Sequence, residues 1–325
     1  MENRNPLLEI RDLSVEFRTD DGIVKAVNHM DLTLEKGKTL GLVGETGAGK
    51  TTTALSILRL IPDPPGVVTG GSVTLSGIDI LKAGKREMKR LRGSLVSMIF
   101  QDPMTSLNPV IPVGEQIAEV FYLHDKISRR EAEEKAGEML ETVGIPATRG
   151  KDYPHQFSGG MKQRVVIAMA LACNPELLIA DEPTTALDVT IQAQVLKLMK
   201  ELKKKYNMAM LMITHDLGIV ADVCDEVSVM YAGRVVEHGT LFDVFEHTAH
   251  PYTEGLFQSI PNIKARTERL KPIRGLMPDP TDIPPGCPFA PRCNYATEQC
   301  TKAMPERTDL SDTHYVYCIR YGKEA

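Results

Sequence analysis

The sequence has no apolar run long enough to cross a membrane. Its longest, 165–173, has nine residues, whereas a membrane-spanning helix needs about 20. The first residues, 1–6, carry no apolar segment of the kind that begins a secretory signal. We therefore expect a cytosolic protein, and its 325 residues give room for about two domains.

Basic residues are too few for a nucleic-acid surface. Lys and Arg number 38 against 43 Asp and Glu, and the net charge is −5. Sequence-independent binding of nucleic acid needs clustered cations. The only basic block is Lys203–Lys205. We expect it to form a solvated helix end, where cations complement the helix dipole.

Tryptophan is absent and cysteine is scarce, but the six cysteines are unevenly placed. Disulfides are rare in the cytosol, so Cys173 and Cys224 are expected to be free thiols. The other four crowd into the last 39 residues, with 5, 6 and 17 residues between them. These spacings match neither zinc-ribbon pairs nor bacterial ferredoxins. An iron–sulfur cluster, a zinc site and free thiols therefore all stay open for Cys287, Cys293, Cys300 and Cys318.

Apolar strand-like runs alternate with helical stretches, which is typical of an α/β fold with a largely parallel sheet. Strands are expected at 39–43, 177–180 and 210–213, and a helix at 52–60. Between residues 102 and 173 the pattern becomes helical. There Ser128 and Glu131 form a capping box, followed by apolar residues at helical spacing: Ala132, Ala136, Met139, Leu140 and Val143. After about Leu256 the composition changes, and seven prolines in 271–291 favour irregular chain.

Residues 44–51 read Gly-Glu-Thr-Gly-Ala-Gly-Lys-Thr and fit the phosphate-loop pattern G-x-x-x-x-G-K-[ST]. Glycines let successive amides turn toward phosphate oxygens, and the following helix adds its positive N-terminal end. Lys50 would reach the β- and γ-phosphates of a nucleotide, and Thr51 would bind Mg²⁺. The expected strand before the loop and helix after it favour this interpretation over a simple turn. The predicted nucleotide-binding residues here are Gly44, Glu45, Thr46, Gly47, Ala48, Gly49, Lys50, Thr51 and Thr52.

A second polar segment follows the apolar strand expected at 177–180. Asp181 and Glu182 come directly after it. The first carboxylate would lie near Mg²⁺, and the second would orient and deprotonate an attacking water. The alternative is a surface Asp–Glu pair, which the phosphate loop in the same chain disfavours.

Residues 157–164 read Phe-Ser-Gly-Gly-Met-Lys-Gln-Arg. They resemble the signature motif, usually written LSGGQ, of the ABC (ATP-binding cassette) ATPases, and the two segments above resemble the Walker A and Walker B motifs of that family. Phe157 replaces Leu and Met161 replaces Gln, but the Ser-Gly-Gly that begins a helix is kept. The resemblance covers about residues 7–250. It implies a RecA-like core with a helical insert, and contacts to the ATP of an opposite subunit from Ser158, Gly159 and Gly160.

The resemblance also implies roles at four single positions. Gln101 resembles the Q-loop glutamine that senses the γ-phosphate, contacts Mg²⁺ and faces a membrane partner. Ala186-Leu187-Asp188 resembles the D-loop between paired sites, and His215 resembles the switch histidine at the γ-phosphate. Phe17 is the candidate aromatic that stacks on adenine, although it could equally be a core residue.

The tail resembles that of oligopeptide and dipeptide importer ATPases. The resemblance rests on His250-Pro-Tyr-Thr, Leu256, Ser259-Ile260-Pro261 and the four late cysteines. It implies an ATPase domain at 1–255, with its helical insert at about 102–172, and a C-terminal domain at 256–325 that holds a [4Fe–4S] cluster. Nickel importers share this cassette, so peptide and nickel both remain as substrates. His247 and His250 have the spacing of a metal pair, but we expect them to be structural.

The family implies a peripheral protein at the cytoplasmic face of the cell membrane, acting on ATP with Mg²⁺. The implied partners are a second homologous ATPase, two membrane permeases and an extracytoplasmic peptide-binding protein. Two other classes of ABC protein are disfavoured by the sequence. A nucleic-acid or ribosome-associated ABC protein would show duplicated cassettes or basic surfaces, and a dead regulatory cassette would lack Glu182 or His215. We also expect Arg292 to offset cluster charge or to face solvent, and the tail to lie far from the ATP site.

Overall fold

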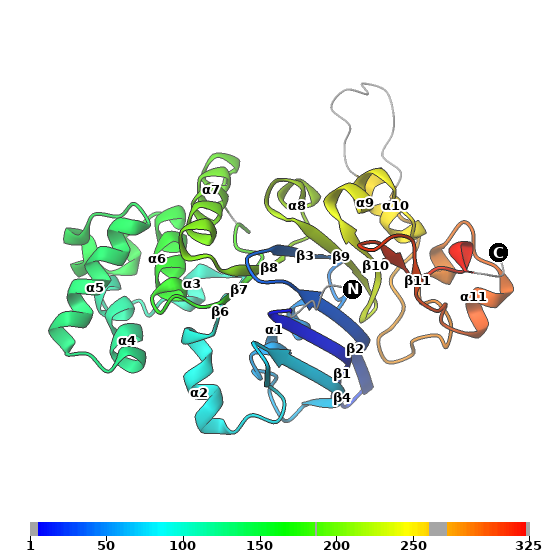
Figure 1. Cartoon of the computed structure of the whole chain (residues 1–325), viewed down its shortest axis with the longest axis horizontal. Coiled ribbons are helices and arrows are strands. Elements are labelled where there is room, and N and C mark those ends of the chain that lie inside the picture. The colour runs from blue at the N-terminus through cyan, green and yellow to red at the C-terminus, as the bar shows by residue number, and fades with distance from the viewer. Residues whose placement is uncertain (1–5, 186, 260–271, 323–325) are drawn as a thin grey trace. The chain divides into compact units, whose positions relative to one another are not determined.

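A computed structural model describes residues 6–185, 187–259 and 272–322 of the chain (Figure 1). Contacts divide the chain into two compact units. The first unit combines Met1–Leu7, Leu34–Thr39 and Ser76–Ile213, and the second combines Leu8–Thr33, Leu40–Leu75 and Thr214–Ala325. The units interleave in the sequence, so neither is one continuous stretch of chain.

The first unit is built around three parallel strands, β6 (Val96–Ile99), β7 (Leu177–Asp181) and β8 (Ala209–Ile213). β7 lies between the other two, with Leu177 opposite Val96 on one side and Ala209 on the other. Every residue of these strands is buried. Parallel strands covered on both faces are continuous apolar runs, which is why the strands expected at 177–180 and 210–213 are confirmed to within one residue.

A helical region in the first unit contains α4 (Val113–Asp125), α5 (Arg129–Thr142) and α6 (Gly159–Leu171), which lie side by side (Figure 1). The Ser128 hydroxyl caps α5 by accepting a hydrogen bond from Glu131 N at 3.2 Å. The apolar residues predicted for this helix and its end are all buried. The remaining elements of this unit are β5 (Ile78–Asp79), α2 (Lys85–Ser94), α3 (Pro103–Ser106), η1 (Ala147–Lys151), η2 (Pro154–Gln156) and α7 (Val189–Tyr206).

The second unit contains a mixed set of strands. β3 (Thr39–Val43) pairs in parallel with β9 (Glu226–Tyr231), so the strand predicted at 39–43 is confirmed. β9 pairs antiparallel with β10 (Arg234–Thr240), which pairs in turn with β12 (Tyr315–Val316) near the C-terminus. β11 (Thr308–Asp309) pairs with β12. The helices of this unit are α1 (Lys50–Ile57), α8 (Leu217–Val223), α9 (Leu241–Glu246), α10 (Pro251–Gln258) and α11 (Glu298–Lys302), with short turns η3 (Ala290–Arg292) and η4 (Ile319–Tyr321).

A separate antiparallel sheet in the second unit was not predicted. β1 (Leu8–Thr19) lies between β2 (Gly22–Leu34) and β4 (Gly66–Leu75), with Leu8 opposite Leu75 (Figure 1). Buried and solvent-contacting positions mix along each strand. A sheet with one solvated face has this weaker pattern, which is harder to recognise than the continuous runs of β7 and β8.

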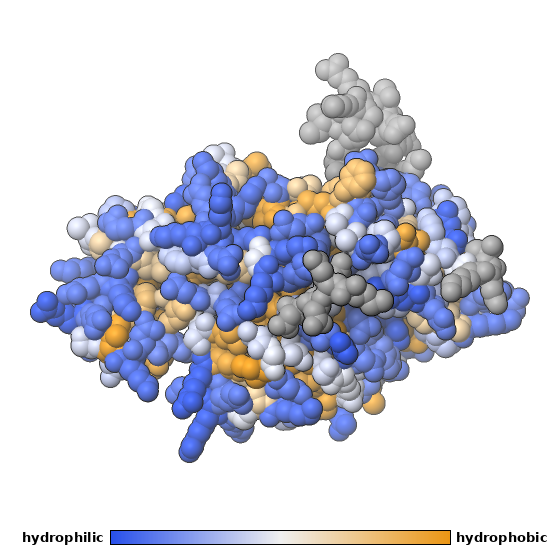
Figure 2. Space-filling model, viewed as in Figure 1, coloured by the Kyte–Doolittle hydropathy of each residue, from blue (hydrophilic) through white to orange (hydrophobic). Residues whose placement is uncertain are grey.

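The face of the molecule drawn in Figure 2 is largely polar. The face seen in Figure 2 is hydrophilic over α5 and α7, and apolar residues form separate patches on it. Lys203–Lys205 lie in the last turn of α7, as predicted. Within 6–185, 187–259 and 272–322, no helix combines the length and hydropathy needed to span a bilayer.

Candidate nucleotide site

The predicted phosphate loop lies in the second unit, between β3 and α1. Gly49 precedes α1 with a φ of 100°, a backbone conformation that favours glycine. A Cβ on Gly49 would lie 2.2 Å from Ala26 O, and one on Gly44 would lie 2.1 Å from Met230 O. Neighbouring backbone therefore encloses the loop at both glycines, and no larger residue fits there.

Lys50 begins α1 and is buried. Its ammonium donates to the carbonyl oxygens of Gly44 at 2.7 Å and Glu45 at 2.9 Å, so the side chain folds back over the loop. Thr51 follows in the first turn of the helix. Backbone amides of a glycine-rich loop, a helix N-terminus and an ammonium together form a site suited to phosphate.

Two predicted catalytic residues meet in the first unit. Gln101 follows β6, and its Nε2 donates to Glu182 Oε2 at 3.0 Å. Glu182 follows Asp181, the buried last residue of β7, and has a φ of +47°. Non-glycine residues at positive φ are uncommon and cluster at functional sites. The turn at Glu182 is fixed by a hydrogen bond from Glu182 N to Ile213 O at 2.8 Å.

Thr185 completes this arrangement and was not predicted. Its hydroxyl donates to Glu182 Oε2 at 2.9 Å, so one carboxylate oxygen accepts two hydrogen bonds. The signal in the sequence is a hydroxyl three residues after the carboxylate, which is a common local contact and therefore weak by itself.

The signature segment begins α6. Ser158 is the N-cap, and its hydroxyl accepts from Met161 N at 3.4 Å. A Cβ on Gly160 would lie 2.4 Å from Ile191 Cγ2 of α7, so the second glycine is needed for close packing of the two helices. Asp188 caps α7 by accepting from Ile191 N at 2.9 Å. Ser158 and Asp188 thus cap helices, and Gly160 allows close helix packing, in addition to the nucleotide contacts that the resemblance implies.

The other predicted positions are distributed over both units. Phe17 lies on β1 opposite Gly66, where its ring leaves no room for a side chain on that glycine. His215 is exposed between β8 and α8. Ala186 of the predicted D-loop and Ile260 and Pro261 of the tail motif lie outside the described residues. Adenine stacking by Phe17 and phosphate contact by His215 remain predictions.

The alternative that Arg292 faces solvent was wrong, and its partner Glu45 was not predicted. Its side chain is 6% exposed and forms an ion pair with Glu45 of the phosphate loop at 2.8 Å. Burial opposes the charge on Arg292, but hydrogen bonds from its guanidinium to Glu45 and Tyr231 outweigh it and raise its pKa. The tail therefore contacts the phosphate loop, and the expectation of a distant tail was wrong too. No sequence rule pairs residues 247 positions apart.

The four late cysteines line one small pocket of about 20 Å³, together with His250 and Phe289. Burial raises the pKa of the Cys287 thiol to about 11, and burial also raises the pKa of Cys293 and Cys318. Across the described part of the chain, no group of three or more His, Cys, Asp or Glu side chains is arranged to hold a metal ion. The thiols are thus gathered, but not in the geometry of a single-ion site.

The two tail histidines make different contacts. His250 is fully buried and caps α10, because its Nδ1 accepts from Tyr252 N at 3.0 Å. His247 packs its ring against Phe242. The structural role predicted for His250 is confirmed, and that for His247 remains a prediction.

The phosphate loop, the strand-end carboxylates and the Ser-Gly-Gly helix define an ATP-binding cassette. Solved cassettes share this fold: the dimeric post-hydrolysis structure of MJ0796 with ADP and Pi covers 72% of this chain and 98% of its own at a TM-score of 0.65 and 24% identity. CbiO1 of Clostridium perfringens covers 74% and 91% at a TM-score of 0.64 and 27% identity.

Family models and curated relatives agree with this class. Residues 27–185 match the ABC transporter model, and residues 236–300 match the C-terminal region of oligopeptide/dipeptide transporters. The oligopeptide transport ATP-binding protein OppD of Bacillus subtilis is 52% identical over 95% of this chain and 87% of its own. A putative peptide import ATP-binding protein of Brucella melitensis is 48% identical over 99% of both chains. The chain belongs to the ABC transporter family, in the group that carries the oligopeptide/dipeptide transporter C-terminal region.

Proposed function

We propose that the chain is the ATP-hydrolysing subunit of an ABC importer for oligopeptides. The observation that carries the ATPase activity is the Glu182 carboxylate, which Gln101 and Thr185 hold directly after the buried strand that ends in Asp181. A catalytically inactive cassette does not need a carboxylate oriented by two hydrogen bonds at this position. The peptide substrate is supported by the match of residues 236–300 to the oligopeptide/dipeptide transporter C-terminal region and by relatives whose names give oligopeptide transport or peptide import.

In this proposal the amides of 44–52 and the Lys50 ammonium bind the β- and γ-phosphates of ATP. Thr51, Gln101 and Asp181 offer hydroxyl, amide and carboxylate oxygens, the donors that fit Mg²⁺, and these residues would hold it. The metal would neutralise charge on the phosphates.

Glu182 acts as the general base toward the attacking water. Its oxygen is oriented by Gln101 and Thr185, so the carboxylate does not have to be ordered during the reaction. His215 contacts the γ-phosphate, and Phe17 stacks on adenine. Asp188 and Ser158–Gly160 contact the nucleotide of the opposite cassette.

The proposed assembly follows the family pattern. The chain pairs with a second homologous ATPase and binds two membrane permeases at the cytoplasmic face of the membrane, and an extracytoplasmic protein delivers peptide. Residues 1–255 form the ATPase domain, and 256–325 form the importer-specific domain. Within that domain, we propose that the four gathered cysteines hold one [4Fe–4S] cluster, with zinc as the competing metal.

The test of the ATPase compares two site variants with two controls. Lys50→Ala should abolish hydrolysis of Mg-ATP, because the ammonium neutralises phosphate charge. Glu182→Gln should bind ATP but hydrolyse it about 10²- to 10⁴-fold more slowly, the usual contribution of a general base. Lys89→Ala and Glu87→Gln, both on exposed positions of α2, should behave as wild type.

The same four variants should be assembled with the importer's membrane subunits in vesicles. Uptake of a labelled oligopeptide should fail with Lys50→Ala and Glu182→Gln and proceed with the controls. Wild-type hydrolysis by Lys50→Ala would contradict the nucleotide site. ATP-dependent uptake of Ni²⁺ but not of peptide would contradict the substrate.

A further inference from the structure

Arg292 joins the tail to the phosphate loop through two hydrogen bonds. Its Nη1 donates to Glu45 Oε2 at 2.8 Å, and its Nη2 donates to Glu45 Oε1 at 3.1 Å. A two-point pair of this kind fixes orientation as well as charge. The exposed fractions of the two side chains are only 6% and 29%, so solvent ions screen the pair less than a surface pair.

The backbone of Glu45 is held from the same part of the second unit. Glu45 N donates to the Tyr252 hydroxyl at 2.9 Å. The rings of Tyr252 and Tyr231 lie 4.5 Å apart, and Arg292 Nη1 also donates to the Tyr231 hydroxyl at 3.2 Å. Groups that follow Glu45 by 207 and 247 positions thus hold its amide and its carboxylate.

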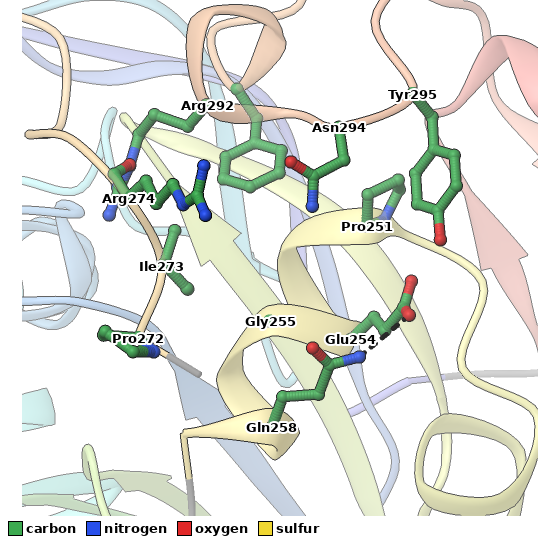
Figure 3. Close-up of a pocket in the computed structure, with 11 residues that line it drawn as sticks. Pro251, Glu254, Gly255, Gln258, Pro272, Ile273, Arg274, Arg292, Asn294 and Tyr295 are labelled. Carbon is green, nitrogen blue, oxygen red and sulfur yellow. Dashed lines mark hydrogen bonds between the residues drawn. The ribbon is translucent and has the colours of Figure 1, made fainter. Parts of the chain in front are cut away.

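Arg292 is itself held in place. Its Nε donates to the carbonyl oxygen of Arg274 at 2.9 Å. Figure 3 shows the two arginines side by side at the wall of a pocket of about 520 Å³. A further tail residue, Met277, lies against the loop, since a Cβ on Gly47 would be 3.0 Å from Met277 Cε. The tail therefore braces the loop at more than one point.

The charge of Glu45 makes this brace relevant to nucleotide binding. Glu45 is the second residue of a loop that is suited to phosphate, and a carboxylate there repels phosphate oxygens. The Arg292 guanidinium offsets that charge. The guanidinium also holds the Glu45 carboxylate against the tail, and this contact restricts the conformations of the phosphate loop.

On the basis of the function proposed above, we propose that Arg292 is a positioning residue for nucleotide binding. It holds Glu45 so that the loop keeps its phosphate-binding shape without adding negative charge to it. The importer-specific tail is then part of the nucleotide site, although it contributes no catalytic group.

The test is a double-mutant cycle on Arg292 and Glu45 in the full chain, read out as the Kd of a fluorescent ATP analogue and as KM and kcat. Arg292→Ala should raise Kd and KM about tenfold, the value of a charge-assisted hydrogen bond, and leave kcat within about twofold. Arg292→Lys keeps the charge but not the two-point geometry, so its Kd should lie between that of wild type and that of Arg292→Ala.

The decisive comparison is made in the Glu45→Gln background. There Arg292→Ala should change Kd by less than about twofold, because the carboxylate that it left unpaired is gone. Arg274→Ala removes a neighbouring guanidinium but keeps the carbonyl that Arg292 uses, and should leave Kd unchanged. Thermal unfolding of each variant shows whether it is folded.

Three outcomes overturn the proposal: a wild-type Kd for Arg292→Ala, an equal loss in the Glu45→Gln background, or an equal loss for Arg274→Ala. A purely structural role of Arg292 would give the second. If the wild-type chain binds no ATP analogue at all, the proposed function itself fails, and the two failures are thus distinguishable. Should Arg292→Ala not fold, Arg292→Lys and Glu45→Gln alone still test the coupling.

Discussion

At the scale of single residues, Gln163 stands out in α6. It lies three residues after Gly160 and is 1% exposed. Among the residues that the structure describes, neither its Nε2 nor its Oε1 has a hydrogen-bond partner. A buried amide without partners costs about 1–3 kcal/mol relative to one that is satisfied.

We therefore predict that Gln163→Met stabilises the protein. Methionine keeps nearly the same length and flexibility, and it removes the unsatisfied amide. The midpoint of thermal unfolding should rise by about 2 °C or more. Gln299→Met, at an exposed position of α11, is the control and should shift the midpoint by less. A lower midpoint for Gln163→Met would mean that the amide is satisfied in solution.

At the scale of elements, α10 begins at a buried histidine. His250 Nδ1 accepts the capping bond from Tyr252 N, so this nitrogen carries no proton. The backbone amides of Ala249 and His250 donate to the buried Glu237 carboxylate at 2.7 and 2.9 Å. Burial lowers the pKa of His250 to about 4 from its ordinary 6.5, although Glu237 acts in the opposite direction.

This pKa shift predicts a pH dependence of stability. The folded pKa lies below the unfolded one, so between pH 6.5 and 4 the unfolded chain binds a proton that the folded chain does not. Stability from the neutral His250 is present above pH 6.5 and is lost as pH falls toward 4, by at most about 1.4 kcal/mol per pH unit. Urea unfolding of His250→Asn, which keeps a capping acceptor, should show a shallower loss than wild type. The exposed His247→Asn should match wild type, and equal slopes for both variants would contradict the assignment.

At the scale of the whole molecule, the C-terminal tail is short of regular structure. Residues 272–322 contain only short helices, turns and two-residue strands. Segments with so few buried apolar residues usually need a staple. A metal held by the four cysteines that line one pocket would supply such a cross-link. Cys287 precedes Arg292 in the sequence, and the other three cysteines follow it.

We predict that protein prepared without oxygen is brown, absorbs broadly near about 400 nm, and contains about four irons per chain. Replacement of any one of the four cysteines by serine should lower the iron content and make the tail easier to cleave. Cys173→Ser and Cys224→Ser should keep the iron. Because Arg292 precedes Cys293 and holds Glu45, loss of the cluster should also weaken ATP binding. One zinc per chain without iron would mean that the four cysteines form a zinc site. The absence of both metals would mean that they are free thiols.

The sequence by itself determined the elements that carry local chemistry. β3, β7 and β8 are short, largely apolar runs of the kind typical of buried parallel strands. The phosphate loop needs glycine at fixed positions for its backbone to turn. Ser158, Asp188 and Ser128 are caps whose partners lie three residues away. Such features depend on a few neighbouring residues, so they can be recognised without a fold.

Only the tertiary structure decided which distant groups meet. Gln101 and Glu182 are 81 positions apart, and Glu45 and Arg292 are 247 apart. Their contacts depend on where each strand ends and on how the tail returns along the second unit. Side-chain chemistry alone pairs Arg292 equally well with any carboxylate, or with none. In the folded chain the Arg292 side chain is buried away from solvent and pairs with Glu45.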